Sequence, residues 1–128
     1  MELLSVPFAI NSPTRAQDGL LFMRGVLCTE ADGLVLEYNA VENYFNKPTV
    51  DSGIRTLRIS WSEVQSLVYR RRFWGLGPSE LVLRTRSLRA LEGVPAANGN
   101  QLTVQIPRAD RLTARELAAS VELALAEH

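Results

Sequence analysis

The sequence holds a single cysteine, Cys28, and a single histidine, His128, among its 128 residues. One cysteine cannot form an intramolecular disulfide, and one Cys with one His cannot supply the four ligands of a structural zinc site. The histidine is the last residue, and chain ends are usually mobile, so Ser-His-Asp and Cys-His catalysis lack a positioned imidazole. We therefore expect no metal and no cofactor, and we interpret Cys28 as a small buried hydrophobic residue.

Long hydrophobic runs are also absent, because no stretch of about eighteen apolar residues occurs, and we expect no membrane-spanning helix. The N-terminus has neither the basic start nor the long apolar core of a signal peptide. An unpaired thiol fits a reducing compartment, so these features together predict a cytoplasmic protein whose only membrane contact would be peripheral.

Charge of one sign is not in excess, since fourteen Lys and Arg residues balance fourteen Asp and Glu residues. A protein without net charge lacks the general field of a non-specific nucleic-acid binder, and we expect no nucleic-acid partner. Hydrophobic residues make up 46% and charged residues 22% of the chain. This composition and length predict one globular domain over residues 1–128.

Apolar and polar residues alternate in six stretches that are separated by turn residues, a pattern typical of short antiparallel strands. The stretches are Leu20–Thr29, Leu34–Asn39, Arg55–Trp61, Glu63–Phe73, Glu80–Arg86 and Leu102–Ile106. Asp32-Gly33 predicts a tight hairpin turn, and a slip in the alternation predicts a bulge near Ser66. Asn43–Gly53 shows no period and predicts a long connection, and residues 1 to about 12 are expected to be flexible.

After Pro107 the period changes to that of a helix, with apolar residues three and four positions apart, which predicts an amphipathic helix over about 111–126. Its start is open between Asp110 and a capping box formed by Thr113 and Glu116. The fold class is therefore α+β: a strongly bent antiparallel sheet, or partly open barrel, of six to seven strands capped by one C-terminal helix. Trp61 is in phase with Leu57 and Ile59 and is expected in the core.

The order of elements resembles the pleckstrin-homology-like (PH-like) superfold, in particular its bacterial PH-like and GRAM-like domains. The resemblance rests on residues 33–38, 57–64 and 106–112 and implies a seven-stranded sheet with a final capping helix. It also implies a bacterial origin, with which the presence of one lysine against thirteen arginines agrees. Members of the superfold bind phosphoinositides through basic residues around the first hairpin. Here the first expected hairpin carries only Arg24, and its turn at 30–32 is acidic.

The densest charge cluster lies between positions 70 and 89, where six arginines accompany one glutamate, Glu80. An aromatic pair sits within it, at the expected tip of a hairpin. Guanidinium groups suit carboxylate or phosphate partners, and exposed aromatic residues anchor protein interfaces or membrane surfaces. The candidate binding residues are Arg70, Arg71, Arg72, Phe73, Trp74, Arg84, Arg86 and Arg89.

One other interpretation of this cluster remains open. The aromatic pair can instead fold back to plug the barrel end, while the arginines pair with Glu37, Glu42 or Glu80.

We expect a non-enzymatic interaction or scaffold module that binds a protein partner or self-associates into a homo-oligomer. The alternatives are peripheral binding to anionic lipids through the basic and aromatic face, and a small enzyme that uses carboxylates such as Asp51, Glu63, Asp110 and Glu116.

Overall fold

A computed structural model describes residues 3–71 and 78–128 of the chain. In this part of the chain, seven strands form one antiparallel sheet, and one α-helix follows the last strand. The strands are β1 (Ser5–Pro13), β2 (Gly19–Glu30), β3 (Gly33–Tyr44), β4 (Val50–Ser60), β5 (Val64–Arg70), β6 (Ser79–Thr85) and β7 (Gln101–Ile106). The helix α1 spans Arg111–Glu127, and short 3-10 turns lie at Trp61–Glu63 (η1), Leu88–Leu91 (η3) and Arg108–Asp110 (η4).

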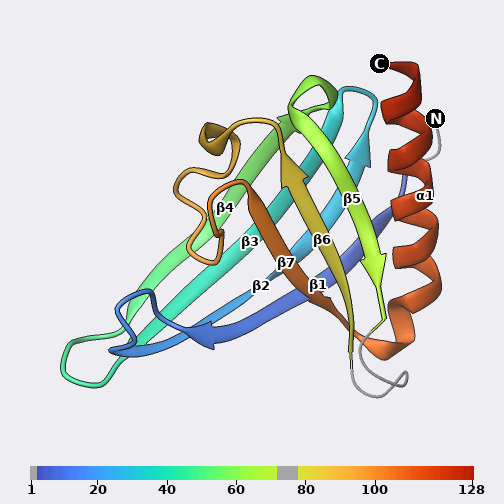
Figure 1. Cartoon of the computed structure of the whole chain (residues 1–128). Helices are drawn as coiled ribbons and strands as arrows, with labels where there is room; N and C mark the ends of the chain where they lie inside the picture. Colours follow the sequence, from blue (N-terminus) through green and yellow to red (C-terminus); the bar gives the residue numbers. More distant parts are fainter. Residues whose placement is uncertain (1–2, 72–77) are drawn as a thin grey trace.

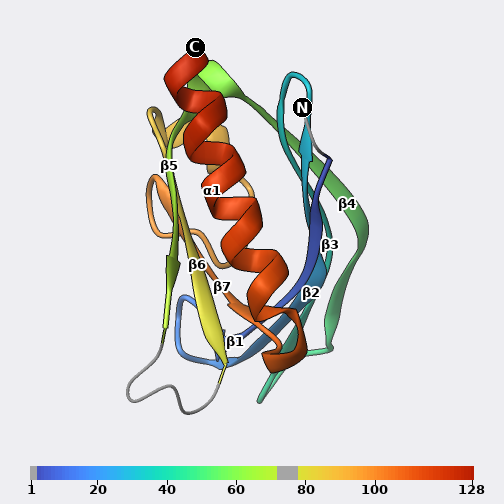
Figure 2. The same cartoon turned by 90° about the vertical axis from the view of Figure 1, so that its right-hand side faces the viewer.

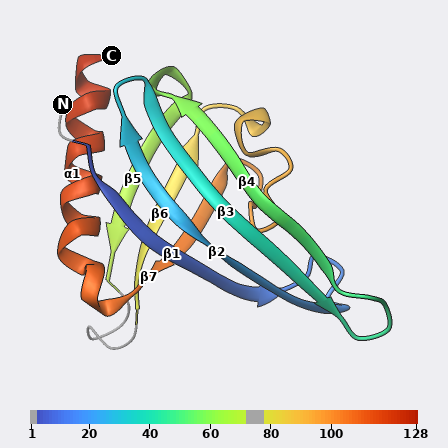
Figure 3. The same cartoon turned by 180° about the vertical axis from the view of Figure 1, so that it is seen from behind.

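The strand order is β4-β3-β2-β1-β7-β6-β5, so β4 and β5 form the two edges and the sheet does not close (Figure 1). The sheet bends strongly, and α1 lies in the mouth between the β5–β7 part and the β1–β4 part (Figure 2). Seen from behind, the long strands β1–β4 present their outer face and α1 lies beyond β1 (Figure 3). The predicted α+β class, a bent sheet capped by a C-terminal helix, is confirmed.

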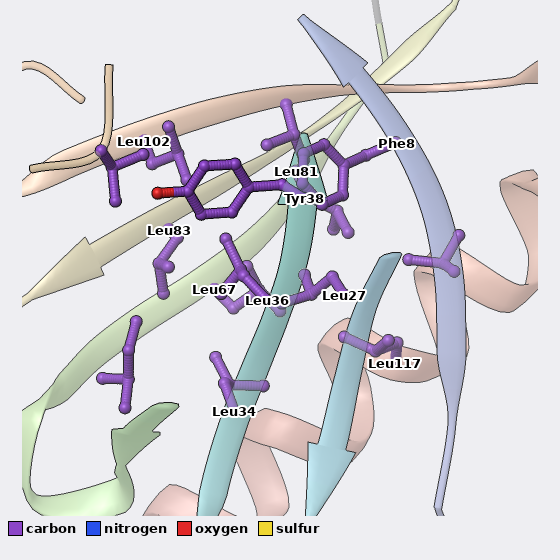
Figure 4. Packing of buried hydrophobic residues seen from close by; sticks show 14 of the residues in the cluster. Phe8, Leu27, Leu34, Leu36, Tyr38, Leu67, Leu81, Leu83, Leu102 and Leu117 are labelled. Atoms are coloured by element: carbon purple, nitrogen blue, oxygen red, sulfur yellow. The ribbon is translucent and has the colours of Figure 1, made fainter. Parts of the chain in front are cut away.

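The hydrophobic core fills the concave side of the sheet, because alternate residues of most strands point there; the largely exposed β4 contributes Ile59 and, partly buried, Leu57. Side chains from all parts of the bent sheet and from α1 meet in it (Figure 4). Labelled members are Phe8, Leu27, Leu34, Leu36, Tyr38, Leu67, Leu81, Leu83, Leu102 and Leu117. Trp61 is also buried, as its phase predicted. Burial of apolar area at about 25 cal/mol per Å² is the main stabilising term for such a domain.

Two predictions about irregular segments are wrong. Residues 5–12, expected to be flexible, belong to β1, which pairs with β2 along its whole length from Ser5↔Cys28 to Pro13↔Leu20. The long connection expected at 43–53 is short, because β3 continues to Tyr44 and β4 begins at Val50. The ribbon of β3 and β4 beyond the core is largely exposed, so its side chains need no apolar alternation.

Several local predictions are confirmed. The register between β5 and β6 shifts between Val64 and Ser66, where the sequence predicted a bulge. Of the two helix starts, the structure has the first: α1 begins at Arg111 after Asp110, and the capping box at Thr113 does not mark the start. Ala114, Leu117, Ala118, Val121 and Ala124 are the buried residues of α1, which packs mainly on β5 and β1.

Candidate functional site

A groove of about 690 Å³ runs between the β5 edge of the sheet and α1. Its sheet wall consists of five consecutive residues, Gln65 to Tyr69. Consecutive residues of a strand point to opposite faces, so a groove that touches all five follows the edge of β5 rather than one of its faces. Its helix wall is a stripe at helical spacing, made of Arg115, Ala118, Ala119, Glu122, Leu125 and Ala126.

Small side chains on α1 keep this groove open. Ala118 is buried beneath it, while Ala119 and Ala126 are exposed along it. On the sheet side, Leu67 is buried, and the hydroxyl of Tyr69 shares a hydrogen bond of 2.7 Å with Ser79 Oγ, which fixes the ring at the rim. The groove is therefore apolar at its base and polar at its margin, as is usual for ligand sites.

In the described part of the chain, no strand neighbours the outer edge of β5, so its backbone N–H and C=O groups can pair with an added strand. No charged side chain lies among Gln65 to Tyr69 to oppose such pairing, and Val68 keeps 51% of its surface exposed. Edges of this kind are normally blocked in proteins that do not use them.

The β4 edge is protected by contrast. Arg55 and Arg58 are both exposed there, and Arg58 forms an ion pair of 2.7 Å with Glu30. Gly53 has a φ of +67°, and its N–H donates to Asp51 Oδ1 at 2.9 Å; the register between β3 and β4 shifts at this point, so a bulge bends the strand. Charges and a bend are the usual means of preventing edge-to-edge pairing. Of the two edges, β5 is therefore the one open to a partner strand.

Among the described residues, the arginines of the predicted basic cluster do not come together in one patch. Arg70 ends β5 and forms an ion pair of 3.1 Å with Glu80, as one of the alternative interpretations anticipated. Arg84 lies four residues along β6 from Glu80 and donates to Gln101 Oε1 at 3.1 Å. The pairings expected with Glu37 and Glu42 are not formed by these two arginines.

The remaining candidates are divided between the two ends of the β5–β6 hairpin. Arg71 is exposed next to Arg70, whereas Arg86 and Arg89 are exposed beyond the opposite end of β6. The described arginines are close in the sequence because the hairpin is short, but in the structure they lie at its two opposite ends. Arg72, Phe73 and Trp74 lie outside the described residues, so their assignment stays a prediction.

A second cleft, of about 420 Å³, lies among the β1–β2 turn, the β3–β4 turn and residues 93–95. The first hairpin is thus β1–β2, not the one at residues 20–39 expected from the sequence. Its charged groups neutralise one another: Lys47 Nζ lies 3.4 Å from Asp18 and 4.7 Å from the centre of the Tyr44 ring. Arg15 donates to the carbonyl of Ala97 at 3.2 Å.

The pKa shifts in this second cleft agree with that internal pairing. A hydrogen bond of 2.8 Å from Thr14 and the nearby Lys47 hold the pKa of Asp18 below its ordinary value. A hydrogen bond to Glu42 raises the pKa of Tyr44, and partial burial adds to the shift. No concentrated positive potential remains there for a phosphate group.

A third cleft, of about 550 Å³, lies on the opposite flank of α1 beside Trp61, Leu4 and His128. The Trp61 and His128 rings stack there, with centres 6.4 Å apart. Cys28 is half-buried on β2, where burial raises the pKa of its thiol and so keeps it protonated. Neither feature positions a nucleophile against a base.

Among residues 3–71 and 78–128, no three His, Cys, Asp or Glu side chains come together in a way that could hold a metal ion. The helix in this part of the chain is too short and too polar to cross a bilayer. Comparison of the chain with protein-family models, curated proteins and solved structures found no significant match.

Proposed function

We propose that this chain is a non-enzymatic interaction module that binds an extended segment of a protein partner in the groove between β5 and α1. The observation that carries the proposal is the open β5 edge beside an apolar groove, on a sheet whose other edge is blocked. In this mode of recognition, the added strand gains main-chain hydrogen bonds from the edge and side-chain contacts from the groove.

The fold resemblance supports the same class of function. The PH-like superfold implies a seven-stranded bent sheet with a final helix, and the described sheet and α1 agree with that expectation. The superfold is widely used as a scaffold for protein contacts, which is an argument by analogy. We place the module in the cytoplasm on the basis of the unpaired Cys28.

The proposal is tested by selecting binders from a displayed library of short peptides that contain no proline or glycine. Ala126→Trp fills the groove from an exposed position of α1, and Leu123→Trp places the same ring on the other flank, where Leu123 is 69% exposed. Selected peptides should bind the Ala126→Trp variant at least about tenfold more weakly than the native chain, which corresponds to about 1.4 kcal/mol. The Leu123→Trp variant should retain native affinity.

Two outcomes contradict the proposal. One is a selection that enriches no peptide on the native chain above the Ala126→Trp variant. The other is a set of binders whose affinity is insensitive to the filled groove. Co-sedimentation with anionic vesicles that weakens with salt would favour the lipid alternative, and sedimentation of the chain at several concentrations would reveal self-association.

A further inference from the structure

The groove wall on α1 carries one cation and one anion, separated by seven residues. Arg115 and Glu122 are both exposed and both line the groove. In the part of the chain that the structure describes, the ion pairs are Lys47–Asp18, Arg58–Glu30 and Arg70–Glu80, which leaves both wall charges without an ionic partner. Seven residues of a helix span about 10.5 Å at 1.5 Å per residue.

The directions of β5 and α1 order these charges along the groove. β5 runs toward the end of the molecule where α1 begins, and α1 runs back in the opposite direction (Figures 1 and 2). Arg115, in the second turn of α1, therefore lies toward the end of β5, and Glu122 lies toward its beginning. A strand that pairs antiparallel to β5 runs in the same direction as α1 and passes Arg115 first.

We infer that the groove selects an extended peptide with the pattern acidic, any residue, apolar, any residue, basic, read from its N-terminus. This inference rests on the proposed function. Residues two and four positions apart point to the same side of a strand, and four residues span about 13 Å, close to the separation of the wall charges. The acidic side chain faces Arg115, the basic side chain faces Glu122, and the apolar one enters between them near Ala118 and Leu67.

Antiparallel pairing fixes the reading direction. Every pair in this sheet is antiparallel, and such pairs are slightly more stable per residue than parallel ones. A peptide with the same composition but the two charges exchanged would place like charges at both ends of the groove. Like-charge contacts suppress wrong partners, so the order of the charges, and not their presence alone, carries the specificity.

The test compares the native chain with the double variant Arg115→Glu with Glu122→Arg. Both positions are exposed, so the double variant should fold and melt as the native chain does. A displayed library with threonine at alternate positions and free choice between them is selected on each. We expect acidic-first peptides on the native chain and basic-first peptides on the double variant. A matched pair, acetyl-Thr-Glu-Thr-Val-Thr-Lys-Thr-amide and its charge-exchanged form, should differ about fivefold or more in affinity, in opposite directions on the two proteins.

The possible failures are distinguishable. In one outcome, peptides bind the native chain and lose affinity for the Ala126→Trp variant, but they show no preferred order of the charges, or the same order on both proteins. This outcome overturns the inference and leaves the proposed function standing. No enrichment above the Ala126→Trp variant overturns both. Basic-first peptides on the native chain and acidic-first peptides on the double variant contradict the antiparallel direction. A charge preference that does not fall as salt rises is also inconsistent with contacts at an exposed wall.

Discussion

The indole Nε1–H of Trp61 donates a hydrogen bond of 2.9 Å to the carbonyl oxygen of Ala31. The Trp61 backbone N–H also donates, at 3.1 Å, to the carbonyl of Asp32. These two bonds attach the turn between β4 and β5 to the β2–β3 turn, directly next to the paired residues Gly33 and Ser60. Trp61 is 3% exposed, so its ring also contributes to the core.

Substitution of Trp61 should separate these two contributions. Trp61→Phe retains most of the buried ring and loses only the donor, and Ala31 is exposed, so water can solvate the freed carbonyl. We expect a loss of about 1 kcal/mol in the free energy of unfolding for Trp61→Phe and about 3–5 kcal/mol for Trp61→Ala. Urea titration measures both. A Trp61→Ala loss no larger than that of Trp61→Phe would show that the ring does not pack as described.

Val121→Asp should destabilise the domain strongly. Val121 is fully buried between α1 and the sheet, and an unpaired carboxylate there must protonate or open the core, at a cost of several kcal/mol. Leu123→Asp is the matched control, because Leu123 lies two residues away on the same helix and is 69% exposed. Thermal melting should show a large drop in Tm for Val121→Asp and little change for the control. Equal melting of both variants would contradict the packing of α1.

Gly25→Ala should destabilise the β2–β3 pairing. A Cβ at Gly25 would lie 2.1 Å from the backbone oxygen of Glu37 and 2.9 Å from Phe8 Cζ, so strand and ring would both have to move. Overpacking of this kind costs about 1–3 kcal/mol. Val26→Ala, at the neighbouring outward position, is the control and should cost less. Urea denaturation that ranks the two variants in the reverse order would contradict this packing.

Thr14→Ala should raise the pKa of Asp18 toward its ordinary value of 3.8, because the hydrogen bond from Thr14 is the main cause that lowers it. A pKa lower in the folded chain than in the unfolded chain stabilises the fold above about pH 3.8, and this contribution is lost as the pH falls through the lowered value. NMR titration of the Asp18 carboxyl carbon measures the shift. Thr49→Ala, which removes a hydrogen bond to Asn43 only, should leave the pKa of Asp18 unchanged.

The sequence predicted most of the strands in which buried and exposed side chains alternate along one segment. Leu34, Leu36 and Tyr38 point into the core on β3, but the turn before them is formed by Ala31 and Asp32, one residue earlier than the predicted Asp32-Gly33 turn, because Gly33 already pairs with Glu30 in the sheet. β1 was missed although Val6, Phe8 and Ile10 alternate, because Pro7 and Pro13 resemble strand breakers and both point outward. Proline lacks only a donor, and this strand accommodates it.

The groove could not be predicted in the same way, because it depends on which strand becomes an edge and where α1 settles against it. Both are consequences of long-range pairing, which no local period encodes. Two weaker signals pointed to it: the alanines at 118, 119 and 126 on one helix stripe, and the uncharged run from Gln65 to Tyr69. The cluster of arginines is more conspicuous in the sequence than either of these two signals, but the β5–β6 hairpin separates the described arginines in space.

The placement of β1 between β2 and β7 has a consequence for how the chain folds. Ala9 pairs with Gln105, a partner nearly a hundred positions away, and α1 packs on β1 as well. During synthesis, β1 to β4 can form hairpins in order, while the second edge of β1 waits for the last quarter of the chain to emerge. Contacts of such high sequence separation slow folding and delay the cooperative transition until translation is almost complete. The β5–α1 groove, which needs the helix as its second wall, is therefore one of the last features of the domain to form.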